Sequence, residues 1–309
     1  MSVVAIAGGT ASIGRAVLEG IQERGHANPI VLSRKYSKET EQELGARIVA
    51  VDYEDAAGLA KLLEANNVGT VISGLDGFGG GESEINLIRA AELSSVTKRF
   101  IPSCWGCHYG PDKSSFAHAI PKIAAEKELE KTSLEWTAVV VGFFLDYYGL
   151  PKVKSHVTHF VTILDIAAGK AAIPGTGDVP AVFTYTQDIG KFTAALLTLP
   201  KWEKQSYIIG DKLTWNEFLK LAEEVRGVKF DVTHDSSETI ASGKITELPG
   251  HVPAYQYFPK GQFQAILAGF SQLFDEGYLD FKPKQTLNDL FPDIKTVTAK
   301  AMLDMGWKA

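Results

Sequence analysis

Short apolar runs rich in β-branched residues alternate, in the first half of the chain, with longer amphipathic segments. The runs are nearly continuous in apolar residues, which is typical of parallel strands covered by helices on both faces. They occupy residues 3–7, 29–34, 47–52, 70–75, 99–103 and 136–142. The segments between them predict helices over 14–24, 57–65, 82–93 and 123–131. The alternation predicts an α/β fold, a Rossmann-type doubly wound parallel sheet.

This alternation stops after Leu150. Pro151 and the turn at 174–177 interrupt the chain, so a smaller C-terminal α+β region is expected. Thr214 and Glu217 form a capping box, which predicts a helix running towards Gly227. The aromatic side chains of this region either line a pocket for a flat ligand or fill a small core. They are Tyr255, Tyr257, Phe258, Phe263, Phe270 and Phe274.

The composition narrows the function class. The 309 residues are 45% hydrophobic and 22% charged, which excludes a disordered chain. A net charge of -6 disfavours nucleic-acid binding, and the longest apolar stretch, 136–145, is shorter than a membrane span. The start at 2–7 leads directly into a glycine turn, and there are two cysteines. We therefore expect no secretory signal and no membrane partner, but a cytoplasmic protein that acts on a small molecule.

The strongest motif directly follows the first predicted strand. Gly8 permits a tight turn, Ala11 lets the backbone approach a pyrophosphate, and Gly14 permits close packing of helix on strand. Free amides at the start of the following helix attract the anion. The alternative is a tight turn of a flavodoxin-like domain. The predicted cofactor contacts in this motif are Gly8, Thr10, Ala11, Ser12, Ile13 and Gly14.

Basic residues follow the second predicted strand. An NAD site would place an acid there, whereas this chain has Ser33, Arg34 and Lys35. Arg34, with Lys35 or Lys38, can bind a 2′-phosphate through charge-assisted hydrogen bonds, which predicts NADPH. The alternative is a solvated basic loop. Asp52, after the third strand, either binds the adenine amino group or caps a loop.

Several stretches together resemble the atypical short-chain dehydrogenases that include isoflavone, phenylcoumaran benzylic ether and pinoresinol reductases and the NmrA-like proteins. The resemblance covers about two thirds of the chain, with the specific part at the N-terminus. It rests on the glycine turn, Ser33-Arg34, residues 85–91 and 98–103, 142–144 and 184–190.

The resemblance implies several site residues. Lys122 matches the family's lysine and is implied to bind the nicotinamide ribose and assist proton transfer, which a partly desolvated lysine can do. Ser73, Ser103 and Phe143 are expected beside the cofactor. The substrate is expected to contact Cys104, Phe144, Tyr147 and Tyr148. Cys104 departs from the family, which often has an acid there.

The resemblance also implies a domain division in which residues 178–205 return to the sheet domain. We expect 1–148 and 178–205 to bind NADP, and 149–177 and 206–309 to bind substrate. The region at 206–309 is expected to close over the nicotinamide. The sequence leaves a homodimer open.

Three further patterns carry less weight. Cys104, Cys107 and His108 match redox and haem patterns and, with His118, a conceivable zinc set, although only one paired spacing exists. The Tyr-x-x-x-Lys pairs at 109–113 and 148–152 each contain a proline, which opposes a helix. Glycines at 76–81 form either a loop that covers the nicotinamide or a plain connection.

The leading hypothesis is an NADPH-dependent reductase of a small aromatic or conjugated carbonyl, imine or quinone-methide-like substrate in secondary metabolism. One alternative is an NmrA-like nucleotide sensor without turnover. Another is a non-redox isomerase or condensing enzyme on the same fold, because fold does not fix function.

Overall fold

The computed structural model describes residues 2–75, 81–110 and 119–308. The chain forms two compact units, each continuous in space but not in sequence. The first contains Met1–Val140, Thr186–Ile208 and Gln285–Ile294. The second contains Val141–Tyr185, Ile209–Lys284 and Lys295–Ala309.

The first unit contains a six-stranded sheet in the order β3-β2-β1-β4-β5-β6, with every neighbouring pair parallel. This confirms the predicted doubly wound sheet. The strands are β1 (Ser2–Ala7), β2 (Ala27–Ser33), β3 (Arg47–Ala50), β4 (Val68–Ser73), β5 (Arg99–Ile101) and β6 (Glu135–Trp136). The last predicted run is split, because β7 (Ala138–Val140) leaves β6 and pairs with β12 (Gln205–Tyr207).

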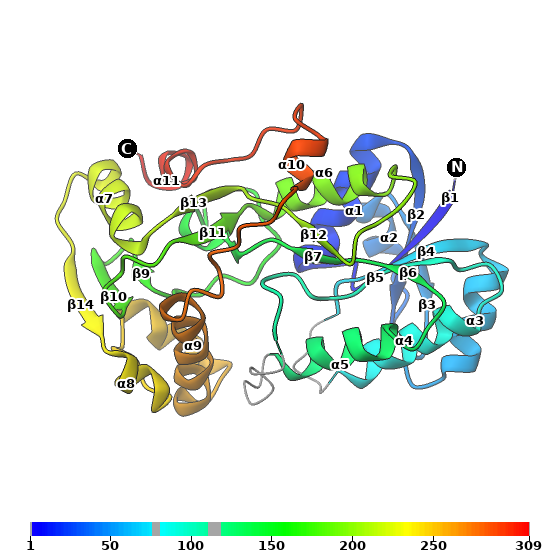
Figure 1. The fold of residues 1–309 in the computed structure, drawn as a ribbon, viewed down its shortest axis with the longest axis horizontal. Coiled ribbons are helices and arrows are strands. Elements are labelled where there is room, and N and C mark those ends of the chain that lie inside the picture. Colours follow the sequence, from blue (N-terminus) through cyan, green and yellow to red (C-terminus); the bar gives the residue numbers. More distant parts are fainter. Residues whose placement is uncertain (1, 76–80, 111–118, 309) are drawn as a thin grey trace. The chain divides into compact units, whose positions relative to one another are not determined.

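Helices cover both faces of this sheet (Figure 1). On one side lie α3 (Ala56–Ala65), α4 (Glu82–Leu93) and α5 (Ile120–Leu129), and on the other lie α1 (Ser12–Arg24) and α6 (Thr186–Leu196). Two glycines let α1 and α6 pack closely, since a Cβ on Gly20 would lie 2.3 Å from the carbonyl oxygen of Gly190. The chain thus returns to the sheet domain at α6, and α10 (Leu287–Leu290) packs against α6 as well.

The sequence did not predict α2 (Lys38–Leu44). Only Leu44 of this helix is buried, so the apolar periodicity that marks a helix is missing. The helix is instead fixed by its ends: the Ser37 hydroxyl accepts the amide of Thr40 at 3.1 Å, and Gly45 ends it in the left-handed conformation. Local capping therefore decides this element.

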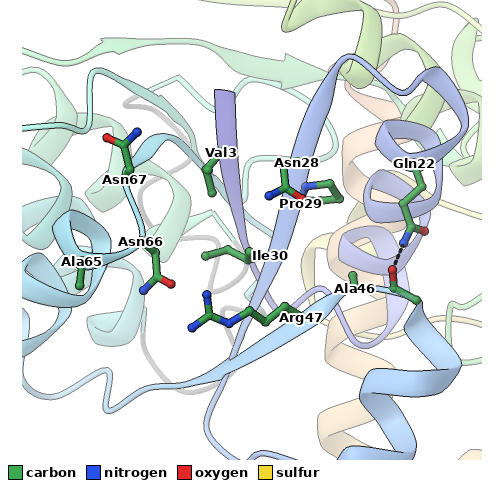
Figure 2. A pocket seen from close by; sticks show the side chains of 11 residues that line it. Val3, Gln22, Asn28, Pro29, Ile30, Ala46, Arg47, Ala65, Asn66 and Asn67 are labelled. Atoms are coloured by element: carbon green, nitrogen blue, oxygen red, sulfur yellow. Dashed lines mark hydrogen bonds between the residues drawn. The ribbon is translucent and has the colours of Figure 1, made fainter. Parts of the chain in front are cut away.

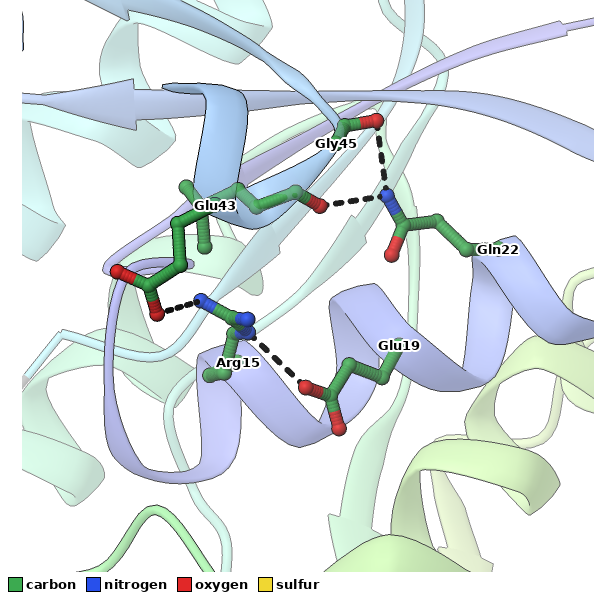
Figure 3. A network of polar contacts seen from close by, with 6 residues as sticks. Arg15, Glu19, Gln22, Glu43 and Gly45 are labelled. Carbon is green, nitrogen blue, oxygen red and sulfur yellow. Dashed lines mark hydrogen bonds and ion pairs between the residues drawn. The ribbon is translucent and has the colours of Figure 1, made fainter. Parts of the chain in front are cut away.

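Polar contacts attach α2 to α1 (Figure 3). The Gln22 amide donates to the carbonyl of Leu44 at 2.9 Å and to that of Gly45 at 3.1 Å. Arg15, near the start of α1, binds Glu19 at 3.0 Å and Glu43 at 3.4 Å. The positive charge nearest the glycine turn along α1 is therefore already compensated.

The second unit contains two three-stranded sheets, β14-β10-β9 and β13-β11-β8. Its strands are β8 (Phe143–Phe144), β9 (Leu164–Asp165), β10 (Lys170–Pro174), β11 (Ala181–Thr184), β13 (Asp211–Leu213) and β14 (Asp231–Asp235). Its helices are η2 (Leu145–Tyr148), α7 (Trp215–Arg226), α8 (Ser237–Ala241), η3 (Pro249–Gln256), α9 (Lys260–Asp275) and α11 (Ala299–Trp307). Both sheets mix parallel and antiparallel pairs, as an α+β region does.

The capping box at the start of α7 is confirmed. Thr214 accepts the amide of Glu217 at 3.2 Å, and the Glu217 carboxylate accepts the amide of Thr214 at 2.8 Å. The helix ends at Gly227 in the left-handed conformation, as the sequence predicts.

The unit boundaries differ from the expected domain boundaries. Residues 141–148 and 178–185 belong to the second unit because β8 pairs with β11, which pairs with β13. Gln285–Ile294 belongs to the first unit, where Phe291 lies under the guanidinium of Arg24 at 5.7 Å from the ring centroid. Pairing in a small sheet is a long-range property that the sequence rhythm does not reveal.

Candidate functional site

The glycine turn joins β1 to α1 through close backbone contacts. Gly8 has a φ of 72°, which favours glycine. A Cβ on Gly14 would lie 2.3 Å from the carbonyl oxygen of Gly8, and one on Gly74 would lie 2.9 Å from the Cα of Gly14. Backbones this close leave no room for side chains. The start of α1 is thus held at the ends of β1 and β4.

The first turn of α1 presents backbone amides. Its N-cap residue, Ala11, makes no side-chain capping bond, and the first turn contains no acidic residue. Thr10 and Ala11 are exposed, whereas Ile13 and Gly14 are buried. Ser12 has a φ of 48°, an uncommon conformation for a residue other than glycine, and such strain clusters at ligand-binding sites. Amides and the helix dipole therefore favour an anion at this turn.

Basic side chains lie just past the end of β2. Arg34, Lys35 and Lys38 are exposed, and none of them has an acidic partner among the residues that the structure describes. Burial raises the pKa of Tyr53 and the Arg34 charge opposes that rise, while the Tyr53 hydroxyl donates to the carbonyl of Leu32 at 3.2 Å. The Ser33 hydroxyl accepts the amide of Lys35 at 3.4 Å. These cations are therefore available to a phosphate.

Asp52 is used locally. Its carboxylate accepts the amide of Glu54 at 2.9 Å, which is the loop-capping alternative of the two that the sequence left open. The side chain is exposed. A contact with adenine stays a prediction.

Strands β4 and β5 end at a buried carboxyl group that the sequence analysis missed. Glu84, in the first turn of α4, is 6% exposed and accepts the amide of Ser103 at 2.6 Å. Burial raises the pKa of Glu84, whereas the Ser103 amide, the Ser73 hydroxyl and the charge of Lys122 oppose that rise. The sequence of α4 is amphipathic, and its pattern does not indicate that the side chain of Glu84 is buried.

Lys122 lies in α5, partly buried. Its ammonium donates to the carbonyl of Trp105 at 3.3 Å and lies 5.5 Å from the ring centroid of Tyr109. A Cβ on Gly106 would lie 3.5 Å from this ammonium, which is ordinary van der Waals contact. The loop after β5 thus forms the surroundings of Lys122.

Both cysteines of this loop are buried, free thiols. Burial raises the pKa of Cys104, and the carboxylates of Glu84 and Glu126 raise it further. The pKa of Cys107 is raised by burial too. Low thiolate content opposes the redox interpretation.

Within 2–75, 81–110 and 119–308, no cluster of three or more His, Cys, Asp or Glu side chains is placed to hold a metal ion. His118 lies outside the described residues. Likewise, Lys113 and the glycines at 77–80 lie outside them. None of the helices that the structure describes is long and apolar enough to cross a membrane.

The predicted residues of the second unit have different surroundings. Tyr148 is 1% exposed, its hydroxyl bonds to that of Thr162 at 2.7 Å, and its ring packs on Phe218 at 4.7 Å between centroids. Tyr148 is therefore a core residue, which corrects its assignment to the substrate wall. Its ring is buried among the aromatic side chains of this unit. Phe144 and Tyr147 are only partly buried.

Phe143 is buried and packs against three rings of its own unit, those of Tyr147, Phe270 and Phe274. Phe263 lies in a second core cluster with Phe160, Tyr255 and Phe258 packed against it. Most of the aromatic side chains predicted as pocket or core are thus core. Tyr257 differs, with 75% of its surface exposed.

A separate cavity of about 400 Å³ lies at the amino ends of β1 to β3 (Figure 2). Its lining includes Arg47, Asn28 and Asn67. None of the predicted site residues lines it. The predicted residues of the first unit instead follow the carboxyl ends of β1 to β5 or lie on α5. The carboxyl ends of the strands are the edge where doubly wound sheets bind ligands.

A curated relative matches nearly the whole chain. Oxidoreductase BOA1 of Botryotinia fuckeliana (strain B05.10) is 35% identical over 303 residues, covering 94% of this chain and 95% of the relative. The name supports the predicted enzyme class, an oxidoreductase.

Solved structures share the fold. The crystal structures titled as pinoresinol-lariciresinol and phenylcoumaran benzylic ether reductases include a chain with a TM-score of 0.77 at 21% identity, covering 99% of each chain. The binary complex of leucoanthocyanidin reductase with NADPH from Vitis vinifera gives a TM-score of 0.73 at 20% identity, covering 98% of each chain.

The family itself follows from the sequence. Residues 1–297 match the NmrA-like family. Because this match spans most of the chain and BOA1 is aligned along nearly all of its length, the resemblance inferred from the glycine turn and the later motifs is confirmed. The chain belongs to the NmrA-like family.

Proposed function

We propose that the chain is an NADPH-dependent reductase that transfers hydride to a small, flat, conjugated carbonyl, imine or quinone-methide-like substrate. One observation carries the proposal: the glycine turn, the cations after β2 and Lys122 all belong to the carboxyl edge of one parallel sheet. One unit therefore carries the groups that can bind the pyrophosphate, bind the 2′-phosphate and transfer a proton. The NADPH complex of the structurally similar leucoanthocyanidin reductase supports this cofactor.

The residues fit the cofactor. The uncapped amides of α1 suit the pyrophosphate, and the close packing of Gly8, Gly14 and Gly74 lets backbone approach it. Arg34 offers a planar fork to the 2′-phosphate, with Lys35 or Lys38 beside it. Bound NADPH would supply the hydride.

Lys122 is proposed to complete the reaction by moving a proton. Its ammonium gives a proton to the substrate oxygen, nitrogen or carbon that gains negative charge when the neighbouring carbon accepts hydride, and water restores the proton afterwards. The Trp105 carbonyl and the Tyr109 ring orient the ammonium without removing its charge. We further propose that Phe144 and Tyr147 contact the substrate.

Turnover tests the proposal. We expect purified protein to oxidise NADPH in the presence of at least one member of a panel of aromatic enones, ketones, imines and quinone methides. Deuterium from 4-deuterated NADPH should appear in the product. Saturable NADPH binding without turnover of any member would favour a nucleotide-sensing regulator, and product formation without NADPH oxidation would favour a non-redox enzyme.

A further inference from the structure

We propose that Glu84 is a positioning residue for Lys122: its buried carboxyl group anchors the loop that holds Lys122 and provides a counter-charge for its ammonium. The inference rests on the proposed role of Lys122 and deepens it. Two observations carry it, a set of contacts and a charge arrangement.

The contacts connect α4 with the segments that follow β4 and β5. Glu84 stands in the first turn of α4 and accepts the amide of Ser103 after β5 at 2.6 Å. The Ser103 hydroxyl donates in turn to the carbonyl of Leu75 at 2.7 Å. The loop that begins at Ser103 is therefore fixed against the ends of β4 and β5.

The same loop reaches Lys122. The Trp105 indole donates to the carbonyl of Ser73 at 2.9 Å, and the Trp105 carbonyl accepts the Lys122 ammonium at 3.3 Å. Ser103, whose amide Glu84 accepts, lies two residues before Trp105 in the same loop, and the Trp105 carbonyl is the atom to which Lys122 donates. A change at Glu84 would be felt at Lys122 through Trp105.

The charge arrangement acts directly. Burial raises the pKa of Glu84, whereas the Lys122 charge lowers it, and the first helical turn also favours a negative charge. Cys104, Cys107 and Tyr109 also face this region, but burial raises their pKa values, so they are neutral near pH 7. Glu126 is engaged with the Cys104 thiol and with His108. Glu84 is thus the buried acid that we assign as the counter-charge of Lys122.

A pH profile separates positioning from mere structure. Glu84→Gln keeps the shape and one acceptor but removes the charge, so the ammonium loses its counter-charge and gives up its proton more readily. We expect the basic limb of the kcat profile to move down by about one pH unit, because an opposite charge nearby shifts a titration by that order. Affinity for NADPH should change little. An unmoved basic limb would overturn the inference.

Glu64→Gln is the matched control. Glu64 also accepts a serine amide and a serine hydroxyl, both from Ser95 at 2.8 Å, but it is exposed. Its profile should equal that of the wild type. If Glu84→Gln fails to fold, Glu84→Asp replaces it; this variant keeps the charge and should keep the wild-type basic limb with a lower kcat, and a displaced limb would count against the inference.

A double-mutant cycle gives a readout that needs no substrate. Glu84→Gln and Lys122→Met should each lower the thermal midpoint, and the double variant should lose less than the sum of the two shifts, because neither charge is then left alone. Additive losses in a protein that still turns over NADPH would refute the coupling and leave the proposed reductase intact. Coupling in a protein that does not turn over NADPH would support the interaction of Glu84 with Lys122 and contradict the proposed reductase.

Discussion

The two halves of the carboxyl edge are built in different ways. The half at β1 and β2 consists of backbone and small residues: Gly8, Gly14 and Gly74 touch through main-chain atoms, and α1 offers uncapped amides. The half at β4, β5 and α5 consists of side chains from distant segments, Glu84, Ser103 and Lys122. A backbone site tolerates almost no added volume, whereas a side-chain site depends on charge.

The largest effect is expected on the side-chain half. Lys122→Met should lower kcat by about 10²–10⁴-fold, the usual contribution of a positioned acid or base, with NADPH affinity nearly retained. Steady-state kinetics and a fluorescence titration measure the two quantities. Lys127→Met, in the last turn of the same helix, is the control and should stay active. Full activity of Lys122→Met would remove this residue from the reaction.

The next effect breaks the backbone half. Gly14→Ala places a Cβ 2.3 Å from the Gly8 carbonyl oxygen, so α1 must move away from the turn. We expect a loss of about 1–3 kcal/mol in the free energy of unfolding and weaker NADPH binding by about tenfold or more. Gly261→Ala meets no atom within 4 Å and should change neither. Chemical denaturation and titration check both values, and unchanged binding would contradict the packing argument.

A third change tests the basic side chains that follow β2, beside the backbone half. Arg34→Ala should weaken NADPH by about ten- to a hundredfold, because a charge-assisted hydrogen bond contributes about 1.5–3 kcal/mol, while NADH changes little. Arg47→Ala removes an exposed arginine at the amino edge of the sheet (Figure 2) and should affect neither nucleotide. Equal losses for NADPH and NADH in Arg34→Ala would defeat the 2′-phosphate assignment.

The smallest effect is expected at His108 and Glu126, which lie beside the side-chain half. Hydrogen bonding to Glu126 raises the pKa of His108, so protonated His108 stabilises the fold below about pH 6.5, and this contribution disappears as the pH rises above the raised value. NMR titration of Glu126→Gln should show the His108 pKa closer to its ordinary value. A pKa that stays raised would mean that another group holds the proton.

The same contrast explains what the sequence could predict. The glycine turn, the parallel strands and the capping box of α7 are local patterns, and the structure has all of them. The sequence did not predict α2 because this helix buries a single residue. It did not indicate Glu84 because the partner of this carboxyl group, Ser103, is 19 residues away. Tyr148 was misjudged because its position after a strand says nothing about the rings that surround it.

The most direct measurement is a titration of the purified chain with NADPH and, separately, with NADH, followed by nicotinamide fluorescence. We expect a saturable complex with both nucleotides, the NADPH complex being at least about tenfold tighter at low salt. If NADPH gives no saturable signal, or binds no more tightly than NADH, the carboxyl edge of the sheet does not hold a phosphorylated dinucleotide and the proposed reductase falls with it.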